Sequence, residues 1–231
     1  QARRARVPIL MYHYISDPPA SADAYRLDLS VRPRDFEAQL AYLQAAGYTS
    51  ISLGDLVRHL TLGDPLPAKP IVLTFDDGYV DNFVYAFPLL CRYNFRATFF
   101  VVPDLVDQGV PGYLTWEQAQ LMAEKGMDIE SHGLDHSELR GESAADQLRQ
   151  VQQSREAIES HLHRPVLFFA YPFGRYDKQT IAALRQAGYR AAVNTQAGVT
   201  HTSWGLFDLT RIRIHGGDGL DKFIAVLDYY R

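Results

Sequence analysis

Two adjacent carboxylates, Asp76 and Asp77, stand where an apolar run ends and Gly78 follows. The preceding residues 71–75 (IVLTF) are typical of a buried strand. Because successive strand residues point to opposite faces, the two carboxylates need not share one role. Two carboxylates at one strand end repel each other and are costly to desolvate without a compensating cation. The pair therefore predicts a cation beside it.

His132 and His136 lie four residues apart, a spacing that lets both imidazoles reach one metal ion from a single turn of backbone. Asp77 would supply the third ligand. Two histidines and one carboxylate leave coordination positions open for water and substrate, which is typical of a catalytic metal site. A histidine pair alone more often lies on the surface, and Asp-Asp-Gly alone is more often a turn. Their joint occurrence favours the metal site.

The elements that must position these residues alternate between strands and helices. Strands are predicted at residues 7–12, 49–51, 71–75, 97–102, 127–130, 166–170, 190–193 and 211–214, and helices at 33–46, 53–62, 80–93, 115–125, 143–161, 177–186 and 220–229. Residues 16–30 read as a loop and 195–207 as irregular. This alternation requires parallel pairing and a sheet covered by helices. About seven units in one α/β domain favour a distorted (β/α) barrel related to the TIM barrel over an open sheet.

His13, Asp76, Asp77, His132 and the turn at Pro172 each follow a predicted strand. In a barrel the carboxyl ends of the strands form one rim. We therefore expect these side chains to meet.

The composition predicts one domain over residues 7–231, preceded by a basic stub at 1–6 that is compatible with a removed export or anchor segment. A net charge of −4 argues against nucleic acid as a partner. No stretch is long and apolar enough to span a membrane. The single cysteine, Cys91, excludes an internal disulfide, and its apolar surroundings predict a small core residue. We expect a monomer.

Three segments resemble motifs of the polysaccharide deacetylases, carbohydrate esterase family four, whose domain is called the NodB homology domain. Residues 74–78 (TFDDG) and 131–136 (SHGLDH) resemble the first two motifs, and 169–174 (FAYPFG) resembles a variant of the third. The resemblance covers nearly the whole chain. It implies a NodB-like barrel and a hydrolase of non-peptide amide bonds.

The resemblance also implies roles for the first two motifs. Asp76 would be the general base, and Asp77, His132 and His136 would hold a divalent metal, with Zn²⁺ expected and Co²⁺ or Ni²⁺ as substitutes. The metal would polarise the acetamide carbonyl and acidify a water molecule. Asp76 would take the proton of that water as it attacks.

The third motif would contribute the oxyanion site. By resemblance, the backbone N–H of Phe173 stabilises the tetrahedral oxyanion. Tyr171, Pro172 and Gly174 would form the substrate-binding turn around it.

Two histidines compete to protonate the leaving amine. His215, in residues 212–215 (IRIH), approximates the usual fifth motif. His13, in residues 10–13 (LMYH), resembles the subgroup that contains the poly-N-acetylglucosamine deacetylases, where a histidine after the first strand takes this role. We favour His13 and keep His215 as the rival.

The chain departs from the family pattern at two positions. The third motif usually carries an arginine where this chain has Ala170, and the usual fourth-motif aspartate is not evident, with Asn194 nearest in place. These residues orient and tune the base in the family. Their absence fits the poly-N-acetylglucosamine deacetylase subgroup better than the typical member of the family.

The predicted function is removal of N-acetyl groups from a glycan that contains N-acetylglucosamine, with a poly-N-acetylglucosamine-like polymer favoured, at an extracellular or cell-surface location. The alternatives are deacetylation of peptidoglycan, chitin oligomers or acetylxylan. A catalytically silent glycan-binding barrel is the alternative outside enzymes, and a bound stoichiometric metal would argue against it.

Overall fold

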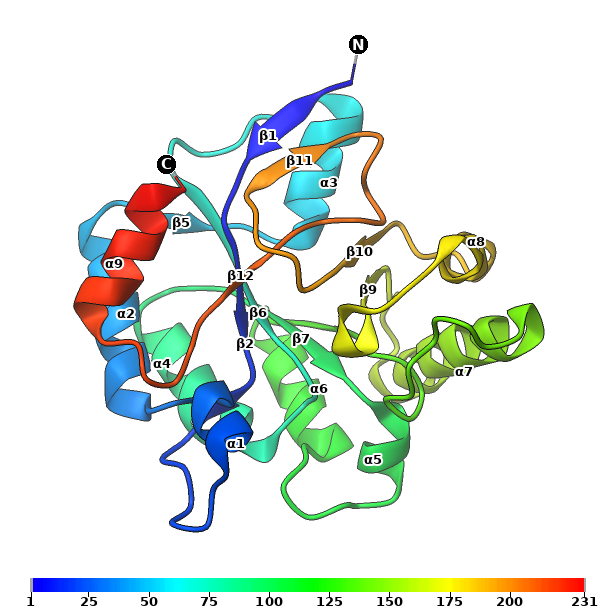
Figure 1. Ribbon diagram of the computed structural model, residues 1–231, viewed down its shortest axis with the longest axis horizontal. Helices are drawn as coiled ribbons and strands as arrows, with labels where there is room; N and C mark the ends of the chain where they lie inside the picture. The colour runs from blue at the N-terminus through cyan, green and yellow to red at the C-terminus, as the bar shows by residue number, and fades with distance from the viewer. Residues whose placement is uncertain (1, 231) are drawn as a thin grey trace.

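The computed structural model describes residues 2–230; Gln1, from the expected stub, and Arg231 lie outside the described residues. Seven parallel strands curl into a half-barrel, which confirms the predicted fold class (Figure 1). In spatial order they are β10 (Ala191–Val193), β9 (Phe168–Ala170), β8 (Asp128–Ser131), β7 (Thr98–Val101), β6 (Pro70–Phe75), β2 (Ile9–Tyr12) and β12 (Ile212–Arg213). A short strand, β5 (Thr49–Ser50), pairs with the start of β6.

The ring of strands is incomplete between β10 and β12. Leu209 forms a single parallel bridge with Val193 of β10, and three residues later β12 pairs with β2. One short segment thus spans the gap without a continuous ladder. The closed barrel that the alternation favours is therefore not reached, because the preceding residues leave the barrel to pair elsewhere.

That pairing partner is the expected stub. Arg4–Arg6 form β1, which pairs antiparallel with β11 (Thr200–Thr202) inside the segment expected to be irregular. In Figure 1 the blue β1 and orange β11 lie together near the N-terminus. Residues 4–6 are part of the fold rather than an appendage to it.

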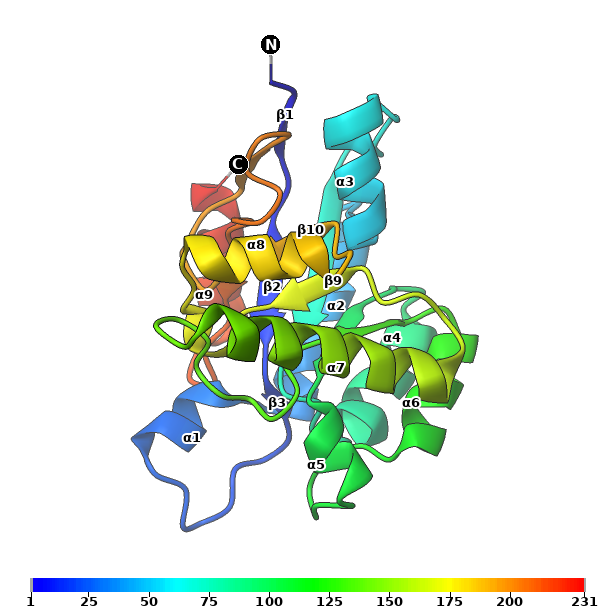
Figure 2. The same ribbon diagram turned by 90° about the vertical axis from the view of Figure 1, so that its right-hand side faces the viewer.

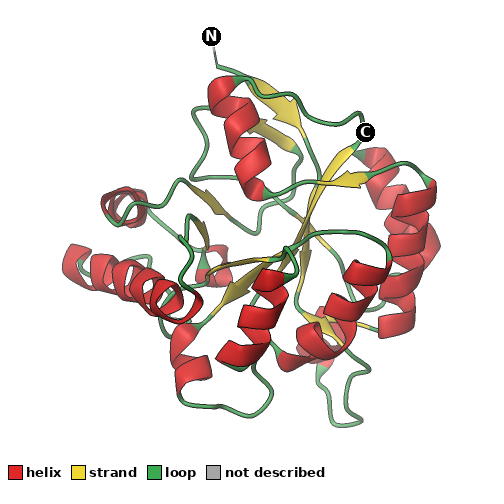
Figure 3. Ribbon diagram, turned by 180° about the vertical axis from the view of Figure 1, so that it is seen from behind, coloured by secondary structure: helices red, strands yellow, loops and turns green. Residues whose placement is uncertain are grey.

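Alternate strand residues pack into two clusters because their side chains point to opposite faces. One cluster joins inward-facing residues such as Ile9, Val72 and Phe100 to helix α3 (Leu53–Leu62). The other joins outward-facing residues to the surrounding helices, which Figures 2 and 3 show around the strands. These are α2 (Pro33–Ala45), α4 (Phe87–Arg92), α6 (Trp116–Glu124), α7 (Ala144–Leu162), α8 (Lys178–Gln186) and α9 (Leu220–Tyr229).

Four short elements were not expected from the sequence. Helix α1 (Ala24–Leu29) lies in the segment 16–30 that was expected to be a loop. Strand β4 (Ser30–Val31) begins at the end of that segment and pairs with β3 (Tyr14–Ile15). Helix α5 (Pro103–Asp107) begins at a proline, which suits the first helical position.

The helix expected over 80–93 contains a π-helical turn, η1 (Asn82–Ala86), before α4. A π turn holds more residues than an α turn and rotates the positions that follow it. Cys91 is accordingly exposed, so the prediction that it is a core residue was wrong. Among the described residues, no helix is both long and apolar enough to cross a membrane.

Candidate active site

The expected residues meet at the carboxyl ends of the strands. A cavity of about 190 Å³ opens there, and its lining residues are Met11, His13, Tyr25, Asp76, Asp77, His132, His136, Tyr171, Phe173, Arg175, Thr195 and Arg213. Strands β2, β6, β8 and β9 each deliver residues to it directly after their last paired position. The shared rim predicted from the strand ends is thus observed.

The turn after β6 is sharp, and its geometry depends on Gly78. Asp77 and Gly78 both have φ of 75°, in the left-handed region that non-glycine residues rarely adopt. A Cβ atom on Gly78 would lie 3.3 Å from the Val101 Cα atom of the neighbouring strand. Backbone strain of this kind is concentrated at functional sites. Here it turns the Asp77 carboxylate toward the histidines that follow β8.

Asp77, His132 and His136 form a cluster that fits a metal ion. The Nε2 atoms of His132 and His136 lie 3.2 and 3.1 Å from Asp77 Oδ1. Two ligands at about 2.1 Å from a tetrahedral zinc ion are roughly 3.4 Å apart, close to these separations. Within the described residues, the potential ligand atoms of this cluster all lie within 4.8 Å of one another. The donor types and spacing match a divalent cation with open positions.

The orientation of His132 supports the same interpretation. Its Nδ1 atom lies 2.7 Å from the Ala170 carbonyl oxygen. A carbonyl oxygen only accepts, so Nδ1 donates a hydrogen to it, and Nε2, which faces Asp77, is the nitrogen that would bind a metal ion once it has released its own hydrogen. Burial raises the pKa of Asp77, but hydrogen bonds from His132 and His136 outweigh burial and hold that pKa well below its ordinary value. The carboxylate is ionised, as a ligand must be.

Asp76 faces a different partner, Arg211. The Arg211 guanidinium is fully buried and donates from Nη1 and Nη2 to the two Asp76 oxygens, each at 2.7 Å. Such a two-point, charge-assisted contact is strong and directional. Burial raises the pKa of Asp76, but the charge of Arg211 and its hydrogen bonds hold the pKa below its ordinary value. Asp76 is therefore an ionised carboxylate that can accept a proton.

Sequence reasoning missed Arg211. The third motif has Ala170 where the family usually has an arginine, and no other arginine was assigned to that place. Asn194, the nearest candidate for the fourth motif, contributes its backbone carbonyl, which accepts from Arg211 Nε at 2.8 Å. The available signal was Arg211 at the start of the predicted strand 211–214, because an arginine buried there would require a partner of opposite charge.

The two candidate acids are separated in space. His13 lines the cavity, and its Nε2 atom lies 4.0 Å from Asp76 Oδ2. Burial lowers the pKa of His13. The negative charges of Asp76 and Asp77 raise this pKa but do not offset the effect of burial. His215 instead pairs through Nδ1 with Asp28 Oδ1 at 2.7 Å and lines a neighbouring surface groove.

The backbone beside His13 is held by the π turn. Asn82, which is fully buried, donates from Nδ2 to the His13 carbonyl oxygen at 2.9 Å. The same Nδ2 donates to Asp81 Oδ1, and Asp81 Oδ2 accepts from Ser16. The residues that follow the first motif thus fix the position of the residue that follows the first strand.

Some residues of the third-motif turn line the cavity, and others fix the shape of the turn. Tyr171 and Phe173 line the cavity, and Phe173 is 55% exposed with φ of 58°. Pro172 is buried and is not among the lining residues. Gly174, also outside the lining, has no room for a side chain, since a Cβ atom there would lie 2.0 Å from Thr195 Oγ1. Of the predicted substrate-binding set, Tyr171 reaches the cavity, while Pro172 and Gly174 shape the turn.

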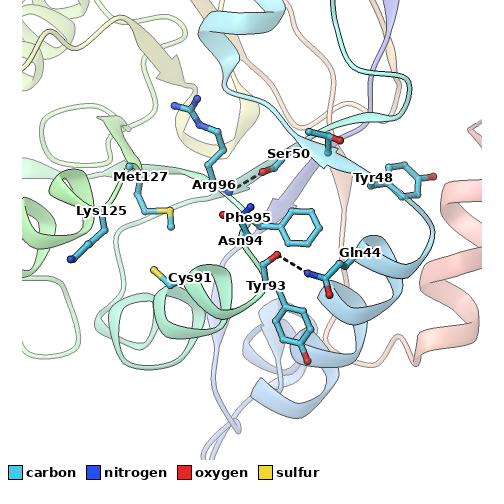
Figure 4. A pocket seen from close by; sticks show the side chains of 12 residues that line it. Gln44, Tyr48, Ser50, Cys91, Tyr93, Asn94, Phe95, Arg96, Lys125 and Met127 are labelled. Carbon is cyan, nitrogen blue, oxygen red and sulfur yellow. Dashed lines mark hydrogen bonds between the residues drawn. The ribbon is translucent and has the colours of Figure 1, made fainter.

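A larger cavity of about 720 Å³ lies where β5, β7 and β8 begin, at the opposite end of the strands (Figure 4). Cys91, Arg96 and Lys125 contribute to its lining. None of the predicted site residues reaches it. Convergent titratable groups, rather than size, identify the candidate active site.

Comparisons with known proteins agree with this geometry. The family model described as polysaccharide deacetylase matches residues 63–192. YxkH of Bacillus subtilis is 33% identical over 97% of this chain and 77% of its own length. The poly-beta-1,6-N-acetyl-D-glucosamine N-deacetylase of Escherichia coli K12 is 24% identical over 93% of this chain, which spans 37% of that protein. The structure of Streptococcus pyogenes deacetylase PplD in complex with acetate superposes with a TM-score of 0.90 at 30% identity, over 97% of this chain and 99% of that one.

Proposed function

The chain belongs to the polysaccharide deacetylase family, and we propose that it is a metal-dependent enzyme that removes N-acetyl groups from a glycan containing N-acetylglucosamine. One observation carries the proposal. The Asp77, His132 and His136 cluster shares a cavity with the ionised Asp76 and with His13. A hydrolase of an amide needs a polarised carbonyl, a base and an acid, and this cavity contains groups for each.

Each side chain then has a task in the proposed reaction. The divalent ion, when bound by Asp77, His132 and His136, supplies positive charge that polarises the acetamide carbonyl and acidifies water. Asp76 accepts a proton from the attacking water while the new C–O bond forms. Arg211 keeps Asp76 ionised by pairing with both of its oxygens.

The remaining steps concern the oxyanion and the leaving group. The backbone N–H of Phe173 stabilises the developing oxyanion. His13 passes to the amine nitrogen the proton that Asp76, 4.0 Å away, has taken from the water, and the C–N bond breaks to release acetate and a free amino sugar. The position of His13 in the cavity, and of His215 outside it, supports this choice of acid.

Within the family, a poly-N-acetylglucosamine-like polymer is the favoured substrate. The histidine after the first strand and the similarity to the Escherichia coli enzyme both support it. Peptidoglycan, chitin oligomers and acetylxylan are the alternatives. We further propose Zn²⁺ as the metal, a monomeric enzyme, and an extracellular or cell-surface location.

Acetate release from a panel of acetylated glycans tests this proposal. We expect release from an N-acetylglucosamine polymer, loss of release after chelation, and recovery when Zn²⁺ is restored. Enzyme-coupled acetate detection and elemental analysis of the purified protein measure both quantities. Release that persists in metal-free protein, or a protein that binds glycan but releases no acetate, would contradict it.

His13→Ala and His215→Ala distinguish the two candidate acids. At saturating substrate, His13→Ala is expected to lower kcat by about 10²-fold or more, because the leaving amine loses its proton donor. His215→Ala should stay within a few-fold of the parent protein, since His215 contacts Asp28 rather than the catalytic groups. Inactivity of the His215 variant alone would make His215 the acid.

A further inference from the structure

The mouth of the catalytic cavity carries an exposed aromatic side chain from an element that the proposed chemistry does not use. Tyr25 of α1 lines the cavity and is 62% exposed. Within the part of the chain that the structure describes, the Tyr25 side chain makes no hydrogen bond or ring contact. The ring is thus available to a ligand at the cavity mouth.

The helix that carries Tyr25 is held firmly on one side by Asp28. Asp28 accepts from Arg213 Nη2 at 2.5 Å and pairs with His215 Nδ1 at 2.7 Å, and its backbone carbonyl accepts from the Gly216 N–H at 2.7 Å. A Cβ atom on Gly216 would lie 2.2 Å from the Leu27 carbonyl oxygen. The end of α1 is therefore packed directly against the segment after β12.

On its other side, α1 is held by Arg26. The Arg26 guanidinium carbon lies 3.0 Å from the Tyr14 ring centroid, and Arg26 Nη2 donates to Ser16 Oγ at 3.3 Å. A helix of 6 residues is too short to be stable alone, so these contacts are what form it. A braced helix presents Tyr25 at little further entropic cost, which favours binding.

The catalytic cavity itself is small. At about 190 Å³ it falls below the usual volume of a pocket that encloses a drug-sized ligand. A polymer whose acetamide enters this cavity must therefore lie over the mouth with its neighbouring rings. A tyrosine combines an apolar ring face with a polar tip, which suits the alternating C–H and hydroxyl surface of a pyranose.

We propose that Tyr25 is a sugar-binding residue, whose ring stacks on a pyranose of the polysaccharide adjacent to the unit that is deacetylated. The proposal rests on the proposed function for its substrate class. In this proposal, the contacts of Asp28 and Arg26 hold α1 so that the Tyr25 ring is presented at the mouth of the cavity. Phe173 contacts the ligand histidine His136 at 4.7 Å between ring centroids, so Tyr25 is the cleaner probe of sugar binding.

The test compares Tyr25→Ala and Tyr25→Phe on two substrates, an N-acetylglucosamine hexasaccharide and 4-nitrophenyl acetate, which has no sugar ring. We expect Tyr25→Ala to raise KM for the hexasaccharide on the order of 3- to 10-fold with kcat little changed, the size of one aromatic contact. Hydrolysis of 4-nitrophenyl acetate should stay within about twofold of the parent. Tyr25→Phe should retain hexasaccharide KM, because the ring face remains.

Tyr229→Ala is the matched control, because Tyr229 is 81% exposed and lies outside the catalytic cavity. Equal losses on both substrates would mean that Tyr25 only supports the fold of α1, and no loss on either would also overturn the proposal. Hexasaccharide binding to an Asp76→Asn background, by calorimetry, is the second measurement. Tyr25-dependent binding without acetate release from the parent would contradict the proposed function and leave the sugar-binding role intact. Acetate release that is unchanged in the Tyr25 variants would overturn the sugar-binding role and leave the proposed function intact.

Discussion

Asp76→Asn is expected to abolish turnover and to leave the divalent ion bound, whereas His132→Ala is expected to lose both. Asparagine cannot accept the proton of the attacking water, and loss of a general base costs about 10²- to 10⁴-fold in kcat. Asp76 faces Arg211 rather than the metal cluster, so its replacement removes no ligand. His132→Ala removes one of the three ligands and leaves the Ala170 carbonyl without its donor.

Acetate release and metal content after dialysis measure the two effects on the same protein samples. His161→Ala is the matched control, because that histidine is on α7 outside the cavity and its loss should change neither quantity. Far-ultraviolet circular dichroism establishes that each variant is folded. If the Asp76 and His132 variants lost metal equally, the separation of base from ligand would be wrong.

The cluster of Asp77, His132 and His136 could be predicted from the sequence because its information is local. Asp77 and Gly78 end an apolar strand, and His132 and His136 share one turn of backbone. Parallel pairing then brings both segments to the same rim without any knowledge of long-range contacts. The conformation of the Asp77 turn follows partly from the same residues, since Gly78 adopts a positive φ at no steric cost.

Helix α1 and strand β1 could not be predicted, because their stability comes from distant residues. Helix α1 has 6 residues and depends on Asp28 contacts to Arg213 and His215, far along the chain. Strand β1 pairs Arg4 with Thr202 and carries two arginines, so it shows no apolar alternation. Elements of this kind leave almost no periodic signal for sequence reasoning to detect.

Arg211 shows another limit of prediction from the sequence. The sequence showed that the usual arginine was missing from the third motif, but not that another segment replaces it. The replacement works because the requirement is for a positive charge at one point in space, which any strand end nearby can supply. Arg211 meets it from the segment that spans the gap between β10 and β12.

Arg211 also joins strands that the hydrogen-bond ladder leaves apart. Beyond Asp76 of the β6 end, it donates to Thr74 Oγ1 at 3.1 Å and to the carbonyl of Asn194, which follows β10. Thr74 Oγ1 in turn donates to the Leu10 carbonyl of β2 at 2.7 Å. One buried side chain therefore serves the base and the incomplete edge of the barrel together.

Arg211→Met is accordingly expected to lose both activity and stability. Removing one partner of a buried ion pair costs about 3–5 kcal/mol, because the other charge is left uncompensated. For a chain of this size that corresponds to a fall in Tm of roughly 6–20 °C. The effect of burial on Asp76 is then opposed only by the charges of His132 and His13, so the pKa of Asp76 rises and the base is weakened as well. Urea denaturation and acetate release measure the two losses, and a variant as stable as the parent would contradict the interpretation.

The double variant, Asp76→Asn with Arg211→Met, separates the charge from the packing. If the uncompensated Asp76 carboxylate causes the instability, removing it should recover much of the lost stability and none of the activity, since replacing both members of a buried pair is often nearly neutral. If the lost bonds to Thr74 and Asn194 dominate instead, the double variant should be no more stable than Arg211→Met alone. A coupling free energy between the two substitutions distinguishes these causes because the residues are in direct contact. Strong coupling would mean that Arg211 is held in the core chiefly by the charge of the proposed catalytic base.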